Sequence, residues 1–152
     1  MTHVGAPLAT STFTLGYADT DPAGILYYAA WFPWMERLQT QWFADAGLRQ
    51  DTLKERFGFW TVNARVECDY LVAVGLLDTI RLELRLGEVR TSSFAMEHTM
   101  WRGEEQVARA VMRLVTVTPD GRATRIPPLL AEHLTAWGEG RTLTPTPQEP
   151  TR

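Results

Sequence analysis

The chain has little cysteine and little histidine among its 152 residues. Its single cysteine, Cys68, cannot form a disulfide within the chain, and its three scattered histidines make no zinc-binding pattern. We therefore expect no metal site and no resident cofactor, and we interpret Cys68 as a packed core thiol. The absence of a disulfide framework predicts a protein of the reducing cytoplasm.

Long apolar runs and an excess of positive charge are also missing. No stretch approaches the roughly 20 apolar residues of a membrane span, and the N-terminal sequence MTHVGAPLATST has no basic segment followed by an apolar core. We expect neither a membrane partner nor a secretory signal. The net charge of −3 argues against a nucleic-acid partner. A hydrophobic content of 45% at this length favours one globular domain.

What the sequence does contain is a compact polar turn that runs into an aromatic segment. Residues 19–24 read DTDPAG, and residues 25–47 hold three of the six tryptophans. Pro22 fixes its own φ angle, and Gly24 permits a left-handed backbone. These residues predict a sharp turn directly before a helix.

The two aspartates of this turn have two interpretations. Asp19 and Asp21 are common turn residues, because a carboxylate accepts hydrogen bonds from nearby backbone N–H groups. The turn also leads into a helix start, where backbone N–H groups are unpaired. A carboxylate beside such donors is the arrangement of an acyl-transfer site, with a nucleophile or base next to an oxyanion-binding group.

The helix after the turn is predicted to be buried on a wide face. We expect a central buried stripe formed by Trp31, Trp34, Leu38 and Trp42, which is widened by Phe32, Met35 and Phe43. Pro33 is tolerated only in the first turn, so the helix cannot begin much before Ala29 or Ala30. This start places the amide of Tyr28 at the helix N-terminus, and Gly47 is the predicted stop.

Period-two alternation dominates the rest of the chain. It predicts strands at residues 12–18, 59–70, 80–86, 93–101 and 107–118. Residues 48–57 are expected to form a short helix or an irregular connector, and residues 129–137 a short helix. The predicted fold is α+β, with a long central helix wrapped by a curved antiparallel sheet of about five strands. We expect a flexible tail over residues 1–11, a single domain over 12–137 and a disordered tail over 138–152.

This order of elements and the turn residues resemble the hot-dog fold of the 4-hydroxybenzoyl-CoA thioesterase family. The family motif is an Asp-x-Asp-x-x-Gly turn, then apolar and aromatic residues, then a helix that carries an acid. Here it reads DTDPAGILYY over residues 19–28, followed by Glu36. The resemblance extends over residues 12–135 and implies an acyl-CoA thioesterase, for which coenzyme A is part of the substrate. It also implies a homo-oligomer, often a dimer of dimers.

The resemblance assigns roles to individual residues. Asp21 matches the catalytic carboxylate, which attacks the thioester carbonyl or directs a water to it, and the backbone N–H of Tyr28 polarises the carbonyl oxygen. The implied substrate-binding residues are Gly24, Tyr27, Trp31, Glu36 and Thr61. Core packing remains an alternative for Trp31, and a structural ion pair remains one for Glu36.

The sequence departs from its relatives at two places. Many relatives have a histidine where Tyr28 stands, so a mechanism that needs that imidazole is not available here. Benzoyl-type enzymes place a Lys-Ser pair at the bend that binds the CoA phosphates, whereas this bend reads RTSS, with Arg90 as its one cation. The implied CoA contacts are Arg90, Ser92 and Ser93. A carrier other than CoA, and a merely solvated Ser92, stay open.

Two other functions compete with thioester hydrolysis. A hot-dog hydratase or dehydratase uses a histidine with an acid partner, but none of His3, His98 and His133 lies in such a motif. A non-catalytic acyl-binding module would use Asp21 only as a helix cap. Among thioesters we expect an aromatic, benzoyl-type acyl group or a short one, and prefer the aromatic group over a long fatty chain because rings crowd the turn and can stack on a ligand ring. Tyr28 and Trp31 are the rings expected to line the site.

Overall fold

The computed structural model describes residues 5–145 and 147, and predictions for the remaining positions lie outside these residues. The strands are β1 (Ala9–Thr14), β2 (Trp60–Tyr70), β3 (Thr79–Val89), β4 (Ser93–Arg102) and β5 (Glu105–Val117). The helices are α1 (Trp31–Asp45), α2 (Leu53–Phe57) and α3 (Pro128–Gly138), and a short 3-10 turn spans Tyr17–Asp19.

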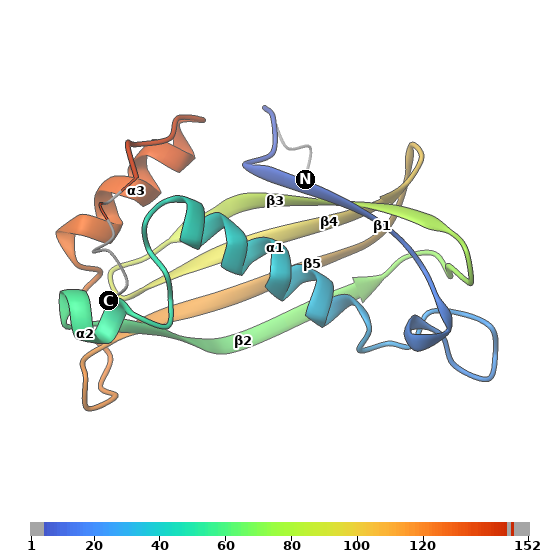
Figure 1. The fold of residues 1–152 in the computed structure, drawn as a ribbon, viewed down its shortest axis with the longest axis horizontal. Helices are drawn as coiled ribbons and strands as arrows, with labels where there is room; N and C mark the ends of the chain where they lie inside the picture. The colour runs from blue at the N-terminus through green and yellow to red at the C-terminus, as the bar shows by residue number, and fades with distance from the viewer. Residues whose placement is uncertain (1–4, 146, 148–152) are drawn as a thin grey trace.

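One antiparallel sheet of five strands carries the fold, in the order β1-β3-β4-β5-β2. Helix α1 lies across one face of this curved sheet, while α2 and α3 lie at the end opposite the 19–24 turn (Figure 1). The predicted α+β arrangement of a long helix against a curved sheet is therefore confirmed. Strands β1 and β2 form its two edges. None of the helices formed by the described residues has the length and apolar character to cross a membrane.

The alternation along β3 shows how the sheet separates its two faces. Ile80, Leu82 and Leu84 are fully buried in the core. The residues between them point to the opposite face, where Arg85 forms an ion pair with Glu83 at 2.9 Å. Because successive side chains of a strand point to opposite faces, this regular pattern was readable from the sequence.

The buried stripe of α1 differs from the predicted one. The side chains buried on this helix are Trp31, Met35, Gln39 and Phe43, at a spacing of four residues. Trp34, Leu38 and Trp42 are half-buried and flank this stripe instead of forming it. On a helix with a wide apolar face, rows of residues spaced by three and rows spaced by four both lie on that face. The position of the sheet therefore decided which row of α1 is buried most deeply.

Strand β1 begins earlier than predicted. Residues 9–11, which we expected in the flexible tail, pair with β3 from Ala9 opposite Leu84 to Thr14 opposite Thr79. The chain then leaves the sheet and makes the turn at Tyr17–Asp19, so the predicted strand over 12–18 was placed too late. Long-range pairing with β3 set this boundary, and no local signal marks it.

The part of the C-terminal segment that the structure describes continues past α3. Thr142, Leu143 and Pro145 line a cavity of about 200 Å³ together with Trp42 and Trp137. The Arg56 guanidinium donates a hydrogen bond to the carbonyl oxygen of Pro147. These residues were predicted to be disordered, but in the structure they lie against the helical end of the domain.

Candidate active site

The turn that carries Asp21 is closed by its own backbone. The Asp21 N–H donates to the Ile25 carbonyl at 3.0 Å, and the Gly24 N–H donates to the Asp21 carbonyl at 2.9 Å. The Ala23 N–H donates to Asp21 Oδ1 at 2.8 Å. One carboxylate oxygen therefore orients the side chain within the turn, as expected for an aspartate before a helix.

Asp19 accepts hydrogen bonds on both of its carboxylate oxygens. Its Oδ2 accepts the Gly16 N–H at 2.9 Å, and its Oδ1 accepts the Trp34 indole N–H at 3.2 Å. Its main-chain oxygen also accepts the Tyr27 N–H at 2.8 Å. Both carboxylate oxygens are thus occupied, which leaves Asp21 as the aspartate of this turn suited to chemistry.

A second segment, residues 71–78, supports the turn from outside. The Leu26 N–H donates to the Val74 carbonyl at 2.7 Å, and Ile25 forms an isolated bridge with Gly75. A Cβ on Gly75 would lie 2.8 Å from the Gly24 carbonyl oxygen, so only glycine fits there without displacing the turn. No pattern in the sequence indicates this contact between two segments about 50 positions apart.

A cavity of about 390 Å³ opens where the turn, α1 and the end of β2 meet. Asp21, Tyr28 and Trp31 line one side, and Tyr70 and residues 71–74 line the other. The structure thus brings three of the predicted site residues together. It adds Tyr70, whose hydroxyl donates a hydrogen bond to the main-chain oxygen of Tyr28.

The start of α1 supplies polar N–H groups beside this cavity. Ala30 precedes the helix and provides no side-chain cap. Within the described part of the chain, the Tyr28 N–H donates to no backbone or side-chain acceptor. Unpaired donors at a helix start, together with the helix dipole, favour a negatively charged atom. The cavity therefore joins a carboxylate to an environment that stabilises an oxyanion.

Residues 15–137 match the model of the Thioesterase-like superfamily. The chain belongs to this superfamily. It is 28% identical to an acyl-CoA thioesterase, YbgC, of Haemophilus influenzae over 101 residues, which are 66% of this chain and 74% of the relative. It is 24% identical to a 1,4-dihydroxy-2-naphthoyl-CoA hydrolase of Prochlorococcus marinus over 113 residues, which are 70% of this chain and 73% of the relative.

The architecture of this thioesterase-like chain is the hot-dog fold that the resemblance implied. The crystal structure of a 4-hydroxybenzoyl-CoA thioesterase variant bound to 4-hydroxybenzoyl-CoA superimposes with a TM-score of 0.73 at 23% identity. The match covers 82% of this chain and 96% of that one. At this level of identity the likeness concerns the fold, so the roles of individual residues rest on their geometry.

Some predicted substrate-binding residues of the thioesterase-like chain lie away from Asp21. Glu36 is exposed on α1 and accepts a hydrogen bond from Thr40 Oγ1 at 2.7 Å. Thr61 lies at the far end of β2 from Tyr70, about 30 Å away at the rise of an extended strand, and its hydroxyl lies 3.3 Å from Gln50 Nε2. Neither side chain lines the cavity, so both roles stay predictions.

Gly24 and Tyr27 lie next to the cavity without lining it. Gly24 has a φ of 79°, the left-handed conformation that the turn motif predicts. The Tyr27 ring packs edge-on against the Tyr28 ring at 4.7 Å. The hydrogen bond between these two side chains raises the pKa of the Tyr27 phenol above its usual value.

The predicted CoA contacts lie at the other end of the molecule. Arg90 borders a cavity of about 460 Å³ between the β3–β4 bend and α3, and it forms an ion pair with Glu88 at 2.8 Å. Arg125 borders the same cavity. Sequence reasoning missed this second guanidinium because 35 positions separate it from Arg90 and no motif marks it.

The two serines of the bend make different contacts. The carbonyl oxygen of Ser92 accepts the Thr116 N–H at 2.9 Å. The hydroxyl of Ser93 accepts a hydrogen bond from Arg113 Nη1 at 3.2 Å. Ser92 therefore holds the bend through its main chain, and the interaction of either hydroxyl with a phosphate stays a prediction.

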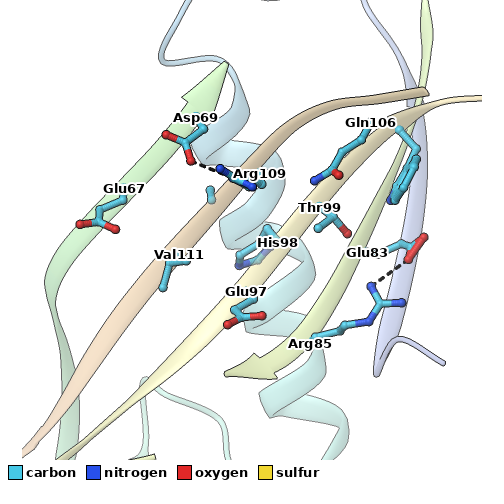
Figure 2. Close-up of a pocket in the computed structure, with 12 residues that line it drawn as sticks. Glu67, Asp69, Glu83, Arg85, Glu97, His98, Thr99, Gln106, Arg109 and Val111 are labelled. Atoms are coloured by element: carbon cyan, nitrogen blue, oxygen red, sulfur yellow. Dashed lines mark hydrogen bonds and ion pairs between the residues drawn. The ribbon is translucent and has the colours of Figure 1, made fainter. Parts of the chain in front are cut away.

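A cavity of about 620 Å³ lies on the outer sheet face, with α1 behind the strands (Figure 2). Some of its charged side chains form ion pairs with each other. Arg109 contacts Asp69 at 2.8 Å and Arg85 contacts Glu83 at 2.9 Å. Neither Asp21 nor Tyr28 lines this cavity.

The histidines offer no centre for a hydratase among the described residues. His98 is fully buried, and burial lowers its pKa to about 4. Its Nε2 lies 3.2 Å from Gln39 Oε1, which ties β4 to α1. His133 lies in α3, at the end of the domain opposite the turn. Neither histidine lines the cavity of Asp21.

Proposed function

We propose that this protein hydrolyses acyl-CoA thioesters in the cavity lined by Asp21, Tyr28 and Trp31. The observation that carries this proposal is the placement of the Asp21 carboxylate beside the uncapped start of α1, in one cavity of a hot-dog fold. Membership of the Thioesterase-like superfamily and the similarity to an acyl-CoA thioesterase support the same reaction.

In this proposal Asp21 acts as nucleophile or as general base. The Ala23 N–H holds Oδ1 and so fixes the direction of the carboxylate. Attack on the thioester carbon, by the carboxylate or by a water that it deprotonates, moves negative charge onto the carbonyl oxygen. The Tyr28 N–H and the helix dipole stabilise that charge. Collapse of the intermediate then expels the CoA thiolate. In the general-base route the thiolate takes up the proton held by Asp21, and in the nucleophilic route a water then hydrolyses the acyl–Asp21 anhydride and releases the acid.

The acyl group that fits best is aromatic. The buried Trp31 ring, 1% exposed, closes the inner side of the cavity, and Tyr28 and Tyr70 border it. Flat rings favour another ring by roughly 0.5–1.5 kcal/mol beyond area burial. Two of the similar proteins are named for aromatic acyl-CoA substrates. A long chain would need a channel past Trp31.

The carrier that fits best is CoA, with its phosphates at the bend of one subunit and its thioester in the Asp21 cavity of a neighbouring subunit, because the two sites lie at opposite ends of one chain. Arg90 and Arg125 place two guanidinium groups at one cavity, which compensates for the single cation of the bend. Guanidinium groups bind phosphate through charge-assisted hydrogen bonds. Ser92 and Ser93 stand beside Arg90 in the same bend and complete the proposed phosphate contacts.

The decisive experiment measures the release of free thiol from benzoyl-, 4-hydroxybenzoyl-, acetyl- and palmitoyl-CoA. We expect kcat/KM to be highest for the aromatic thioesters and at least about tenfold lower for palmitoyl-CoA. Higher activity on palmitoyl-CoA would refute the aromatic pocket but not the thioesterase. Tight binding of every thioester without hydrolysis would identify a non-catalytic acyl-binding module instead.

A further inference from the structure

Tyr70 joins two parts of the site that are distant in the sequence. It is the last residue of β2, and its hydroxyl donates a hydrogen bond to the main-chain oxygen of Tyr28, in the turn before α1. Both residues line the cavity of Asp21. The contact therefore connects the sheet directly to the backbone segment that presents the Tyr28 N–H.

We propose that Tyr70 is a positioning residue for thioester hydrolysis, which holds the Tyr28 backbone so that its N–H points at the carbonyl oxygen of the substrate. This inference rests on the function proposed above. Tyr70 touches neither the scissile bond nor Asp21 in this assignment. It acts through the main chain of Tyr28.

The backbone at Tyr28 needs such a restraint. Residues 28–30 form a turn and not a helical segment. The Ala30 N–H donates to the Tyr27 carbonyl at 2.8 Å, but within the described residues the Tyr28 N–H has no acceptor and α1 has no side-chain cap. A catalytic donor must stay within a narrow range of directions to stabilise an oxyanion. A hydrogen bond to the Tyr28 carbonyl restricts rotation of the adjoining peptide.

Tyr70 is itself held firmly enough to serve this purpose. Its backbone pairs with Ala108 of β5. The N–H groups of Leu71 and Val72 both donate to the Val107 carbonyl, at 2.9 and 3.1 Å. The end of β2 is thus fixed on both sides of Tyr70, and the phenol projects from a rigid element.

The Tyr70 hydroxyl also stays protonated at neutral pH and can therefore donate a hydrogen bond. Burial, together with the neighbouring Cys68 thiol and Tyr28, raises the pKa of Tyr70 to about 12. Burial likewise raises the pKa of Cys68. Both groups therefore stay neutral in a neutral assay, and the hydroxyl proton remains available to the Tyr28 carbonyl.

The hydrogen bond from Tyr70 to the Tyr28 carbonyl can be detected by NMR, without an assay of enzyme activity. The chain contains two Tyr-Ala steps, at residues 17–18 and 28–29. Protein labelled with carbonyl-13C tyrosine and 15N alanine gives two correlations in an HNCO spectrum. We expect Tyr70→Phe to shift the carbonyl resonance of Tyr28 and to leave that of Tyr17 in place. An unchanged Tyr28 resonance would overturn the proposal.

Steady-state kinetics then distinguish a positioning role of Tyr70 in catalysis from a role in the stability of the fold alone. We expect Tyr70→Phe to lower kcat on benzoyl-CoA by roughly three- to tenfold, with KM within about twofold of wild type and a melting temperature lowered by only a few degrees, because a single hydrogen bond contributes about 1 kcal/mol to stability. The matched control, Tyr17→Phe, removes the hydroxyl of an 85% exposed tyrosine outside the cavity and should leave both constants unchanged. Wild-type kcat in Tyr70→Phe, or a rise in KM alone, would overturn the positioning role.

The two proposals fail in different ways. If Asp21→Asn keeps wild-type turnover, the assigned thioesterase site is wrong, whatever Tyr70→Phe does. If Asp21→Asn is inactive and Tyr70→Phe is indistinguishable from wild type, the site stands and the role of Tyr70 is refuted.

Discussion

The indole N–H of Trp34 donates to Oδ1 of Asp19 at 3.2 Å, and this bond fastens the turn to helix α1. The Trp34 ring stacks on Phe13 of β1, with centroids 3.9 Å apart and planes 4° from parallel. The Arg37 guanidinium covers the same ring at 4.9 Å. The turn that carries Asp21 is therefore anchored to both the helix and the sheet.

Asp19 makes structural hydrogen bonds, whereas Asp21 is the proposed catalytic carboxylate. Substitutions of the two aspartates should therefore have different effects on turnover and on stability. Asp21→Asn should lower kcat by on the order of 10²-fold or more, because asparagine keeps the bond to the Ala23 N–H but is neither a base nor a nucleophile. Asp19→Asn should change kcat much less but lower stability by about 1 kcal/mol, because an amide offers one acceptor oxygen in place of two. Steady-state kinetics and urea unfolding of both variants check this pair.

Arg90 and Arg125 should act on the carrier and not on the acyl group. Alanine at either position should raise KM for benzoyl-CoA several-fold and leave kcat/KM for the N-acetylcysteamine thioester, which lacks phosphates, unchanged. Arg122→Ala is the control, because this exposed arginine pairs with Asp120 at 3.0 Å outside the cavity. An equal loss of kcat/KM on both thioesters would show that Arg90 and Arg125 do not bind the CoA phosphates.

Gly75→Ala should displace the turn that carries Asp21. The new Cβ would lie 2.8 Å from the Gly24 carbonyl oxygen, which is backbone and cannot rotate away. We expect a loss of about 1–3 kcal/mol in stability, together with a fall in kcat of at least about tenfold. Gly16→Ala is the matched control, since its Cβ would meet Asp19 Oδ2 at an ordinary 3.9 Å. Similar behaviour of the two variants would contradict the close packing of residues 71–78 on the turn.

His98 should make the fold sensitive to acid. Burial lowers its pKa from 6.5 to about 4, so between these values the unfolded chain binds a proton that the native chain does not. Stability should therefore fall as pH drops from about 6.5 to 4, by up to about 3 kcal/mol from this residue. Urea unfolding across this range, compared with His98→Gln, measures the contribution. Identical pH slopes for the two proteins would show that His98 does not titrate as described.

The β2 edge predicts self-association. This strand has eleven residues, and its exposed apolar side chains Val66 and Tyr70 continue into Leu71. Unprotected edges of this kind pair with other strands. Light scattering at micromolar concentration should report a multiple of 17.2 kDa. Val66→Lys should shift this mass towards the monomer, and Val89→Lys, at an equally exposed valine away from β2, should not. A wild-type monomer would refute the prediction.

The sequence by itself determined the features that depend on local chemistry. Alternation placed the five strands within a few residues, because side chains of a strand point to opposite faces in turn. Pro22, Gly24 and the two aspartates specified the turn, and Pro33 restricted the start of α1. These signals also located the candidate carboxylate, Asp21.

The tertiary structure decided everything that depends on which segments meet. The register of β3 set where β1 begins, and the position of the sheet chose the Met35 row of α1 as its buried centre. The end of β2 brought Tyr70 to Tyr28, and the β3–β4 bend brought Arg90 near Arg125. Residues that are dozens of positions apart meet through strand order and packing, and no local pattern in a single sequence encodes those contacts.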